Sequence, residues 1–536
     1  MGAHAAGAGG RPVSAPGTGG VVPERGEDPG MMGDITLLEF LSLGRRVEGH
    51  RPWPRFALDL RGWRQLIDHL RVAEWSVMAE WAERSEIHVA LRDEASGDIA
   101  VASHRCDDRR FLALGNVRPG VIRIERAIHD VWGLTPVGLE DRRHWLDHGR
   151  WPSRMPLAAQ PMAPSAEPDR YPFLQAVGDG LHQIPVGPVH AGVIEPGHFR
   201  FHCQGEAVVR LEQRLGYQHK GIEGLLQGAP LDKAARIVAR VSGDSTVAYS
   251  LAFARAVEAA TGCEVPARAH WLRGVMAEME RVANHVFDIG AVCNDAAFAV
   301  MLSHMGVLRE KVLRANDVLF GHRLNMDRIV PGGVSLDLSD EGVEALKHLL
   351  YGFGKLLEQG YQLYENTPSL SDRTVSTGIV QTSLIHRFGA GGFVGRASGR
   401  GHDARETPSY PPYDKLDMTV PVLTEGDVNA RVLVRFAEAK ESLHLINRML
   451  HEMPEGAVRV PLPEVAGEGM GVAESFRGEV VVWLRLGADH VVERCHPHDP
   501  SWFQWPLLEA AIEGNIVADF PLCNKSFNCS YSGHDL

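Results

Sequence analysis

Cysteine spacing decides much of the chemistry open to this chain, because closely spaced thiolates are the side chains that bind soft metals. No two of the seven cysteines stand in a CxxC pair; they occupy positions 106, 203, 263, 293, 495, 523 and 529. This spacing fits neither a disulfide framework nor a zinc or iron–sulfur motif. We therefore expect a reducing compartment, and we expect Cys523 and Cys529 to be ordinary buried residues rather than metal ligands.

The composition is that of a large globular protein. Of the 536 residues, 44% are hydrophobic and 23% charged, and 55 Lys and Arg against 68 Asp and Glu give a formal charge of −13. Because phosphate binding requires a basic face, we expect no nucleic-acid partner. The sequence shows neither a clean apolar stretch of about 20 residues nor a signal-peptide core. We expect a cytoplasmic protein whose membrane contact comes through partners.

The sequence divides into four segments, and the fold class we expect is α+β. Residues 1–30 are rich in Gly and Pro and poor in bulky apolar side chains, which predicts a disordered tail. Residues 31–152 mix strand and helix patterns, which predicts a small α+β domain. The proline-rich residues 153–172 are interpreted as a linker, and residues 173–536 as one large domain.

Apolar residues recur every three or four positions in several long stretches of the large domain, which predicts a bundle of long helices with peripheral β-structure. The predicted long helices cover residues 238–260, 271–290, 297–320, 342–365 and 428–453. Strands are predicted at 207–211 and 480–486 in the large domain, and at 87–91 and 121–124 in the small one.

Several motifs of the large domain occur in an order known from one protein family. Gly187-Pro188-Val189-His190 and Glu195-Pro196-Gly197-His198-Phe199 come first, followed by Tyr217-Gln218-His219-Lys220-Gly221-Ile222-Glu223. Further along are Glu280-Arg281, Pro331-Gly332-Gly333, Tyr413-Asp414 and Met453-Pro454-Glu455-Gly456. The ordered set resembles the large subunit of the energy-converting, membrane-bound (group 4) nickel–iron hydrogenases and its relative, the 49 kDa-type subunit of respiratory complex I.

The small domain carries a resemblance of its own. Glu125-Arg126-Ala127, with Asp130 and Gly133, and Asp141-Arg142-Arg143 are similar to motifs of the 30 kDa-type subunit that pairs with the 49 kDa-type subunit. The resemblance implies that both subunits are fused here into one chain, as in the large subunit of formate hydrogenlyase.

In the hydrogenases of this family, four thiolates from two CxxC pairs hold the nickel–iron centre. The resemblance places the first pair on Ser242 and Ser245 and the second on Ser530 and Gly533. Hydroxyls do not replace polarisable sulfur as ligands of nickel and iron. We therefore expect this chain to bind no metal or other cofactor of its own. A shift of register onto Cys529 would restore one thiolate but no pair.

The resemblance also singles out candidate catalytic residues. Arg477 resembles an arginine that overhangs the metal site, and Glu195 and Glu223 resemble glutamates that move protons or organise a magnesium site. Each carboxylate has a structural alternative, an ion pair, which for Glu223 would form with Lys220 at helical spacing. Buried carboxylates with raised pKa values would suit proton transfer.

His198 resembles the histidine that holds a quinone head group in complex I, whereas the tyrosine of that site falls on Gly243. The alternative is a strand-start histidine without a ligand. We further expect Ser242, Asp244, Ser245 and Ser530 to line the vacated metal site, as a polar pocket that conducts protons or binds an anion.

The leading interpretation is a hydrophilic large subunit of a membrane-associated, hydrogenase-like or complex I-like oxidoreductase complex, without its own nickel–iron centre, that couples electron transfer to ion translocation. Two alternatives stay open: a quinone-reducing subunit that uses His198, and a purely structural coupling subunit. The implied partners are an iron–sulfur small subunit with a 4Fe-4S cluster, a ferredoxin-like subunit and ion-pumping membrane subunits. These would hold the chain at the cytoplasmic side of the inner or plasma membrane.

Overall fold

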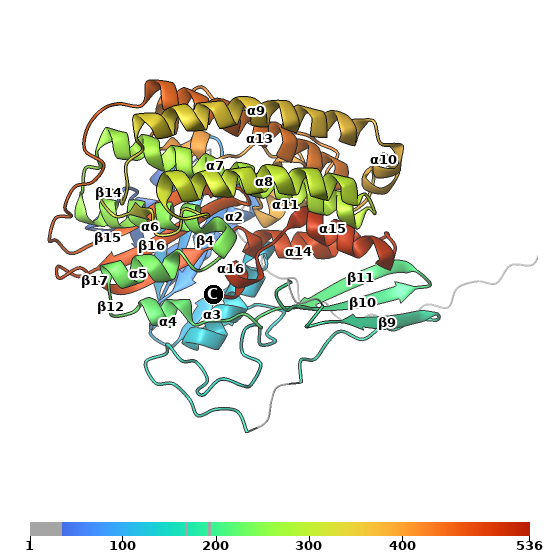
Figure 1. Ribbon diagram of the computed structural model, residues 1–536. Coiled ribbons are helices and arrows are strands. Elements are labelled where there is room, and N and C mark those ends of the chain that lie inside the picture. The colour runs from blue at the N-terminus through green and yellow to red at the C-terminus, as the bar shows by residue number, and fades with distance from the viewer. Residues whose placement is uncertain (1–34, 167–169, 191–193) are drawn as a thin grey trace, which may run out of the picture. The chain divides into compact units, whose positions relative to one another are not determined.

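Helices and sheets alternate through most of the chain, as Figure 1 shows for the computed structural model, which describes residues 35–166, 170–190 and 194–536. The predicted tail, residues 1–30, lies outside the described residues. From Leu37 onward the chain forms a single unit in which long helices and several small sheets pack together. The predicted α+β class is confirmed.

The first sheet has five strands and belongs to the N-terminal part of the chain. Its strand order is β1-β3-β6-β5-β4. The bounds are β1 Arg45–Val47, β3 Arg55–Leu58, β4 Trp75–Ala82, β5 Glu86–Asp93 and β6 Ile99–Arg105. The predicted strand at 87–91 is therefore confirmed as part of β5. Helix α2 (Leu60–Val72) follows β3 and begins where the Asp59 carboxylate accepts the N–H of Gly62 at 2.7 Å.

The predicted strand at 121–124 is wrong. Val121 ends a 3₁₀ turn, and the next three residues open helix α3 (Ile122–Trp132). This helix ends at Gly133 in the left-handed conformation, with φ of 67°. The apolar positions of this helix continue through Ile128 and Val131 with helical spacing. Four residues were too few to distinguish this spacing from the alternation of a strand.

A second five-stranded sheet joins the two ends of the chain. Its order is β12-β17-β16-β15-β2. The bounds are β2 His50–Arg51, β12 Ala229–Pro230, β15 Gly467–Ser475, β16 Gly478–Leu486 and β17 Val491–His498. Strand β16 confirms the strand predicted at 480–486. The N-terminal strand β2 pairs parallel with β15, so the region predicted as a separate small domain contributes a strand to the sheet of the large one.

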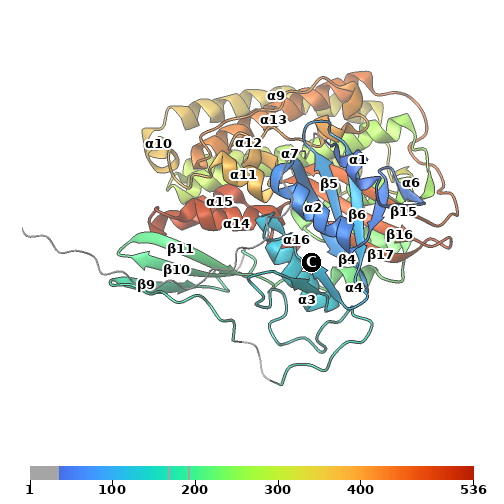
Figure 2. The same cartoon turned by 180° about the vertical axis from the view of Figure 1, so that it is seen from behind.

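Ion pairs and a ring contact hold β4, β5 and the turn between them against this second sheet. Figure 2 shows the strands of both sheets from behind. Arg92 of β5 pairs with Glu479 of β16 at 2.7 Å, and Arg485 of β16 pairs with Glu83 at 2.9 Å. The Trp81 ring lies 5.4 Å from that of Trp483. The predicted linker, residues 153–172, contains turns, bends and an isolated bridge in the part that the structure describes.

Four long helices form the predicted bundle: α7 (Ala267–Asp295), α8 (Ala299–Phe320), α9 (Asp340–Glu365) and α13 (Val428–Glu452). Helix α7 packs against α8 and α13, and α9 packs against both of those (Figure 1). The four corresponding predictions are confirmed. No helix among the described residues combines the length and apolar character needed to cross a membrane.

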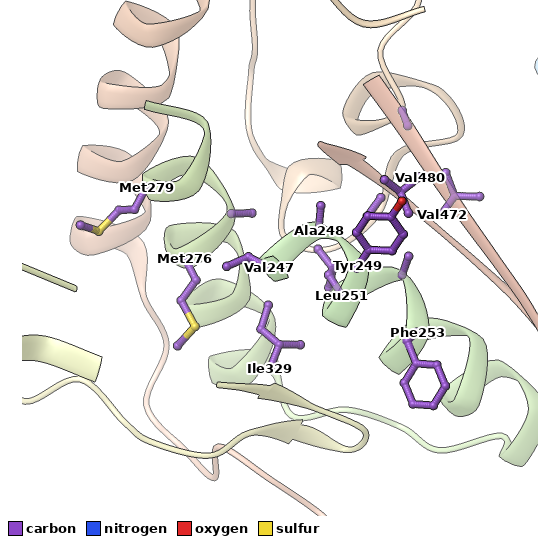
Figure 3. Close-up of a cluster of buried hydrophobic side chains, with 14 of the residues drawn as sticks. Val247, Ala248, Tyr249, Leu251, Phe253, Met276, Met279, Ile329, Val472 and Val480 are labelled. Atoms are coloured by element: carbon purple, nitrogen blue, oxygen red, sulfur yellow. The ribbon is translucent and has the colours of Figure 1, made fainter. Parts of the chain in front are cut away.

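The helix predicted at 238–260 begins later than expected. Helix α5 (Leu231–Val238) ends at the residue where the predicted helix starts, and α6 (Thr246–Thr261) begins only after the short 3₁₀ turn Gly243–Ser245. The prediction is confirmed for residues 246–260 and wrong for the break before them. Ser, Gly and Asp favour turns and helix starts over helix interiors, which explains the break. Figure 3 shows the buried side chains of α6, among them Tyr249 and Leu251, near Met276 of α7 and Val472 of β15.

Helix α6 lies unusually close to β15. A Cβ atom on Gly469 or Gly471 would collide with the carbonyl oxygen of Ala256 or Ala252, respectively. Glycine at these positions thus lets the helix backbone touch the strand.

A third sheet and three C-terminal helices follow in the part of the fold that contains the site. Strands β9 (Leu181–Val186), β10 (His198–Gln204) and β11 (Ala207–Arg214) form an antiparallel sheet, and β11 contains the predicted strand at 207–211. Helices α14 (Ser501–Ile512), α15 (Phe520–Phe527) and α16 (Tyr531–Asp535) follow the second sheet.

A network of fully buried charges connects the bundle to the second sheet. Its cationic members are Arg281, Arg396, Arg405 and, when protonated, His285; its acidic members are Glu278, Asp403, Glu438 and Glu474. Arg396 bonds Glu438 of α13 at 2.6 Å and Glu474 of β15 at 3.0 Å. Burial and the neighbouring charge of Asp403 raise the pKa of Glu474 to about 7, so the excess acid is partly neutralised by proton uptake.

We expect Glu438→Ala to lower the free energy of unfolding by about 3–5 kcal/mol, because it leaves Arg396 and His285 without a carboxylate they contact inside the protein. Urea unfolding of the purified chain followed by circular dichroism measures the change. The matched control is Glu452→Ala, which removes the exposed pair with Arg448 from the end of the same helix and should change stability by at most about 0.5 kcal/mol. Equal effects of the two substitutions would contradict this role of the network.

Candidate functional site

The first half of the site is the turn before α6, which carries Ser242, Asp244 and Ser245. The start of α6 is held from α7, because the Glu280 carboxylate accepts the N–H groups of Val247 at 2.7 Å and Ala248 at 3.1 Å. Burial raises the pKa of Glu280 to about 8, although the two N–H donors act in the opposite direction. Asn284 of α7 also donates to the Asp244 carbonyl at 2.8 Å. The turn is therefore fixed by α7.

The second half is the segment between α15 and α16. Asn528 ends α15 with φ of 47°, and Ser530 begins α16, its hydroxyl accepting the Gly533 N–H at 2.9 Å. The Ser530 backbone is held from α14, where the Ser501 hydroxyl accepts its N–H at 2.9 Å and the Trp505 indole N–H donates to its carbonyl at 3.2 Å.

The two halves meet through serine hydroxyls. The Oγ atoms of Ser242 and Ser530 lie 2.8 Å apart, and the Ser242 hydroxyl also reaches the Asp244 carboxylate at 2.9 Å. Residues that are 288 positions apart in sequence are thus in direct contact.

Gly533, the remaining position of the four, has no space for a side chain. A Cβ atom there would collide with the Asp499 carboxylate. That carboxylate is fixed by the Tyr249 hydroxyl at 2.6 Å and by the Ser501 N–H at 2.8 Å.

Arg477 crosses from the β15–β16 turn to the serine turn. Its guanidinium donates to both Asp244 carboxylate oxygens, at 2.8 and 2.6 Å, and to the Ser245 hydroxyl at 3.1 Å. Its Nε donates to the Asn528 carbonyl at 2.5 Å, so one side chain bonds both halves of the site. Burial would raise the pKa of Asp244, but the bidentate contact with Arg477 outweighs it and holds that pKa at about 2.

A cavity of about 510 Å³ opens beside these residues. Arg477 and Lys525 face it together with Asp244, Glu195 and Asp295, so charges of both signs line it. Lys525 donates to Asp288 and to the Asn528 side chain, each at 3.1 Å. Glu195 is placed by the Ser532 N–H at 3.0 Å. The cavity can hold water and transfer protons between fixed polar groups. Because its charged side chains are of both signs, they leave little net charge to attract a strongly charged ligand.

The donors at the four positions do not fit a nickel–iron centre, because three hydroxyls and a glycine supply no thiolate. Cys529 lines the same cavity, and its thiol donates to the Gln504 side-chain oxygen at 3.9 Å. Burial raises the pKa of Cys529, and it raises that of Cys523 to about 11, so both thiols stay protonated at neutral pH.

The structure does not bring His198 to the lining of this cavity. His198 opens β10, its Nδ1 lies 3.3 Å from the Gly187 carbonyl, and its ring packs 5.0 Å from that of Phe173. Burial lowers its pKa. His198 therefore stands at the start of a strand, and its role toward a quinone stays a prediction.

Glu223 is also away from the serine cluster, and the partner expected for it is wrong. Arg494 and the His496 ring nitrogen each contact its carboxylate at 2.7 Å. Burial would raise the pKa of Glu223, but these two groups hold it at about 2. Lys220 instead donates to the Val241 carbonyl at 2.7 Å, because the sharp turn before α4 (Ile222–Leu226) directs it elsewhere.

Sequence reasoning missed Asp499, Lys525 and Ser532. No spacing pattern links Asp499 to Gly533 or Lys525 to Asp288, since each pair comes from different elements. For Ser532, its position between Ser530 and Gly533 was an available signal.

The Asp244–Arg477 pair should make the stability difference between wild type and Asp244→Asn depend on pH. The pKa of Asp244 is about 2 in the folded chain, against about 4 in an unfolded one. The pair therefore stabilises the fold fully above pH of about 4 and loses this effect as pH falls towards 2. Thermal unfolding of wild type and Asp244→Asn between pH 6 and 3 should show a gap that narrows with acidity. The gap is modest, since the Asp244 side chain is 37% exposed.

The control for this experiment is Asp68→Asn, which alters an exposed pair with Arg71 and should show no such narrowing. A gap between wild type and Asp244→Asn that stays constant across this pH range would contradict the assignment.

Two family models match this chain. Residues 220–289 match the model described as nickel-dependent hydrogenase, and residues 295–466 match the 49 kDa subunit of the respiratory-chain NADH dehydrogenase. The first match contains the serine turn and the second contains most of the helix bundle.

Named relatives agree with these matches. The chain is 31% identical to hydrogenase-4 component G of Escherichia coli K12 over 444 residues, which cover 80% of this chain and 76% of the relative. It is also 31% identical to the carbon monoxide-induced hydrogenase of Rhodospirillum rubrum over 350 residues, 65% of this chain and 97% of the relative.

A solved structure of the archaeal membrane-bound sulfane sulfur reductase contains a chain with the same fold. The TM-score is 0.64 at 24% identity, and the match covers 68% of this chain and all of the other. The relatives, the family models and the assembled positions of the serine site lead to one conclusion. This chain belongs to the family of large subunits that includes the group 4 membrane-bound hydrogenases and the 49 kDa-type subunit of complex I.

Proposed function

We propose that this protein is the hydrophilic large subunit of a membrane-associated, hydrogenase-like oxidoreductase complex in which it holds no nickel–iron centre and instead couples electron transfer in partner subunits to ion translocation. The relatives include a hydrogenase-4 component and a membrane-bound hydrogenase subunit. Electrons in such an arrangement would pass through an iron–sulfur cluster of a partner, because the described residues of this chain supply no thiolate pair for one.

The observation that carries the proposal is the direct contact between Ser242 and Ser530. At 2.8 Å, the two hydroxyls satisfy each other where the family would place thiolates from two separate CxxC pairs. Arg477 and Asp244 complete the network, and Asp499 occupies the space beside Gly533. The chain has therefore replaced a metal-binding donor set by a self-satisfied polar one, which supports a role other than hydrogen activation.

The contribution of this chain to coupling would lie in the polar cavity. Glu195, Asp244, Arg477 and Lys525 present charged, hydrogen-bonding groups that respond to a charge placed nearby. Electron arrival at a neighbouring cluster would change the field at these groups, and the charge pairs would pass that change to the helices that hold them. We do not place a quinone here, since His198 is absent from the described lining of the cavity.

Metal analysis tests the proposal directly. The complex, purified from membranes of its native source under reducing conditions, should contain iron from its clusters but no stoichiometric nickel when measured by inductively coupled plasma mass spectrometry. A relative with both CxxC pairs, purified in parallel, controls for loss of nickel during preparation. A nickel content that approaches one atom per large subunit would overturn the proposal.

The partner assignment predicts how the chain distributes in cell fractions. The tagged chain should sediment with membrane vesicles in wild-type cells and move to the supernatant when the gene of the iron–sulfur small subunit is deleted, because the proposed membrane contact comes through that partner. Immunoblotting of both fractions measures the shift, and re-expression of the deleted gene is the control. Persistent sedimentation in the deletion strain would contradict the assignment.

A further inference from the structure

A second cavity, of about 340 Å³, lies between N-terminal elements and the large domain, away from the serine cluster. Strand β4 and helix α3 line one side of it, and β17, α14 and residues 219–221 line the other. Its volume falls within the range of about 300–1,000 Å³ found for small-molecule sites. It also exceeds by roughly tenfold the volume that a single water occupies in the liquid.

The walls of this cavity are mainly apolar. Helix α3 contributes Ile124, Ala127, Ile128 and Val131, and Trp502 of α14 faces it as well. Such walls offer water few hydrogen bonds, so most of the volume suits an apolar body better than a water cluster.

A small group of unpartnered polar atoms faces the same space. Both carboxyl oxygens of Glu80, both ring nitrogens of His498 and the Nε2 of His496 lack a hydrogen-bond partner among the residues that the structure describes. Glu80 is 0% exposed and His498 1% exposed. Buried polar groups are almost always paired, so these atoms require a hydrogen-bonding partner inside the cavity.

Burial favours the uncharged forms of Glu80 and His498. Burial raises the pKa of Glu80 well above its ordinary value, and the nearby Glu125 carboxyl raises it further. Burial and the neighbouring His496 lower the pKa of His498 to about 3. Glu80 can therefore donate through its carboxylic O–H, and the His498 imidazole can both donate and accept.

We propose that this cavity binds a neutral small molecule with an apolar, ring-sized body and one hydrogen-bonding head group, of which a substituted phenol is the simplest example. The apolar side chains of α3 enclose the body, and Glu80 and His498 meet the head group. An ion is disfavoured, because the charged side chains of the lining are already paired inside the protein: Lys220 with the Val241 carbonyl and Glu223 with Arg494. No unpaired charge is left in the lining to balance that of an ion.

A ligand in this cavity would affect the serine site through Lys220. This lysine lines the cavity, and its ammonium donates to the Val241 carbonyl at 2.7 Å and to the Ser532 carbonyl at 3.4 Å. Val241 precedes Ser242 and Ser532 follows Ser530 by two residues, so one side chain links the cavity to both halves of the site. The binding proposal itself does not depend on the function proposed above.

Isothermal titration of the full chain in its complex, with p-cresol and toluene as probes, tests the inference. The two probes share a ring and a methyl group, and only p-cresol carries a hydroxyl. We expect p-cresol to bind roughly tenfold more tightly, which corresponds to one hydrogen bond to a buried partner. His498→Phe should remove most of this preference while toluene binding is kept.

Ala127→Phe should abolish binding of both probes, because the new ring fills the cavity from α3. Ala437→Phe, an equal change at an exposed position of α13, is the matched control and should bind as wild type. Circular dichroism establishes that each variant is folded. Absence of p-cresol binding to the wild type, or undiminished binding to a folded Ala127→Phe variant, would overturn the inference.

Discussion

The buried charge network between the bundle and the second sheet is the interaction on which the site depends. Arg281 of α7 donates to the carbonyls of Glu474 and Ser475, at 2.7 and 3.0 Å, and Arg396 bridges Glu438 of α13 to Glu474. These contacts fix the end of β15 and hence the turn that carries Arg477. Buried charges need such complete pairing, so a shift in α7 or α13 would displace the turn as well.

Arg477 transmits that placement to both halves of the serine site. It binds Asp244 and Ser245 on one side and the Asn528 carbonyl on the other, and the Ser242–Ser530 contact lies between them. In a metal-containing relative, a bound centre would itself connect two such segments. Here, hydrogen bonds and one ion pair make the connection, which explains how the fold persists with hydroxyls where the family places thiolates.

The N-terminal part of the chain is more closely joined to the large domain than a linker between independent domains implies. Strand β2 extends the second sheet, and Arg92, Glu83 and their partners on β16 tie the two sheets together. A fused chain can keep such an interface at any concentration, whereas separate subunits must associate to form it. The apolar cavity beside α3 lies within this interface and is a consequence of it.

The sequence by itself determined the family, the α+β class and four of the long helices, because motif order and helical periodicity are local properties of the chain. It also singled out Ser242, Ser245, Ser530 and Gly533, which the resemblance predicts to stand at the thiolate positions. Two predictions from local patterns were wrong. At residues 121–124 the stretch was too short to distinguish a strand from a helix, and at 239–245 the apolar pattern continued across a turn. Only the tertiary structure decided that Ser242 meets Ser530, that Asp499 closes the space at Gly533, that Glu223 pairs with Arg494, and that His198 lies outside the described lining of the polar cavity. These are contacts between distant segments, and their geometry is set by how helices and sheets pack rather than by the spacing of residues along the chain.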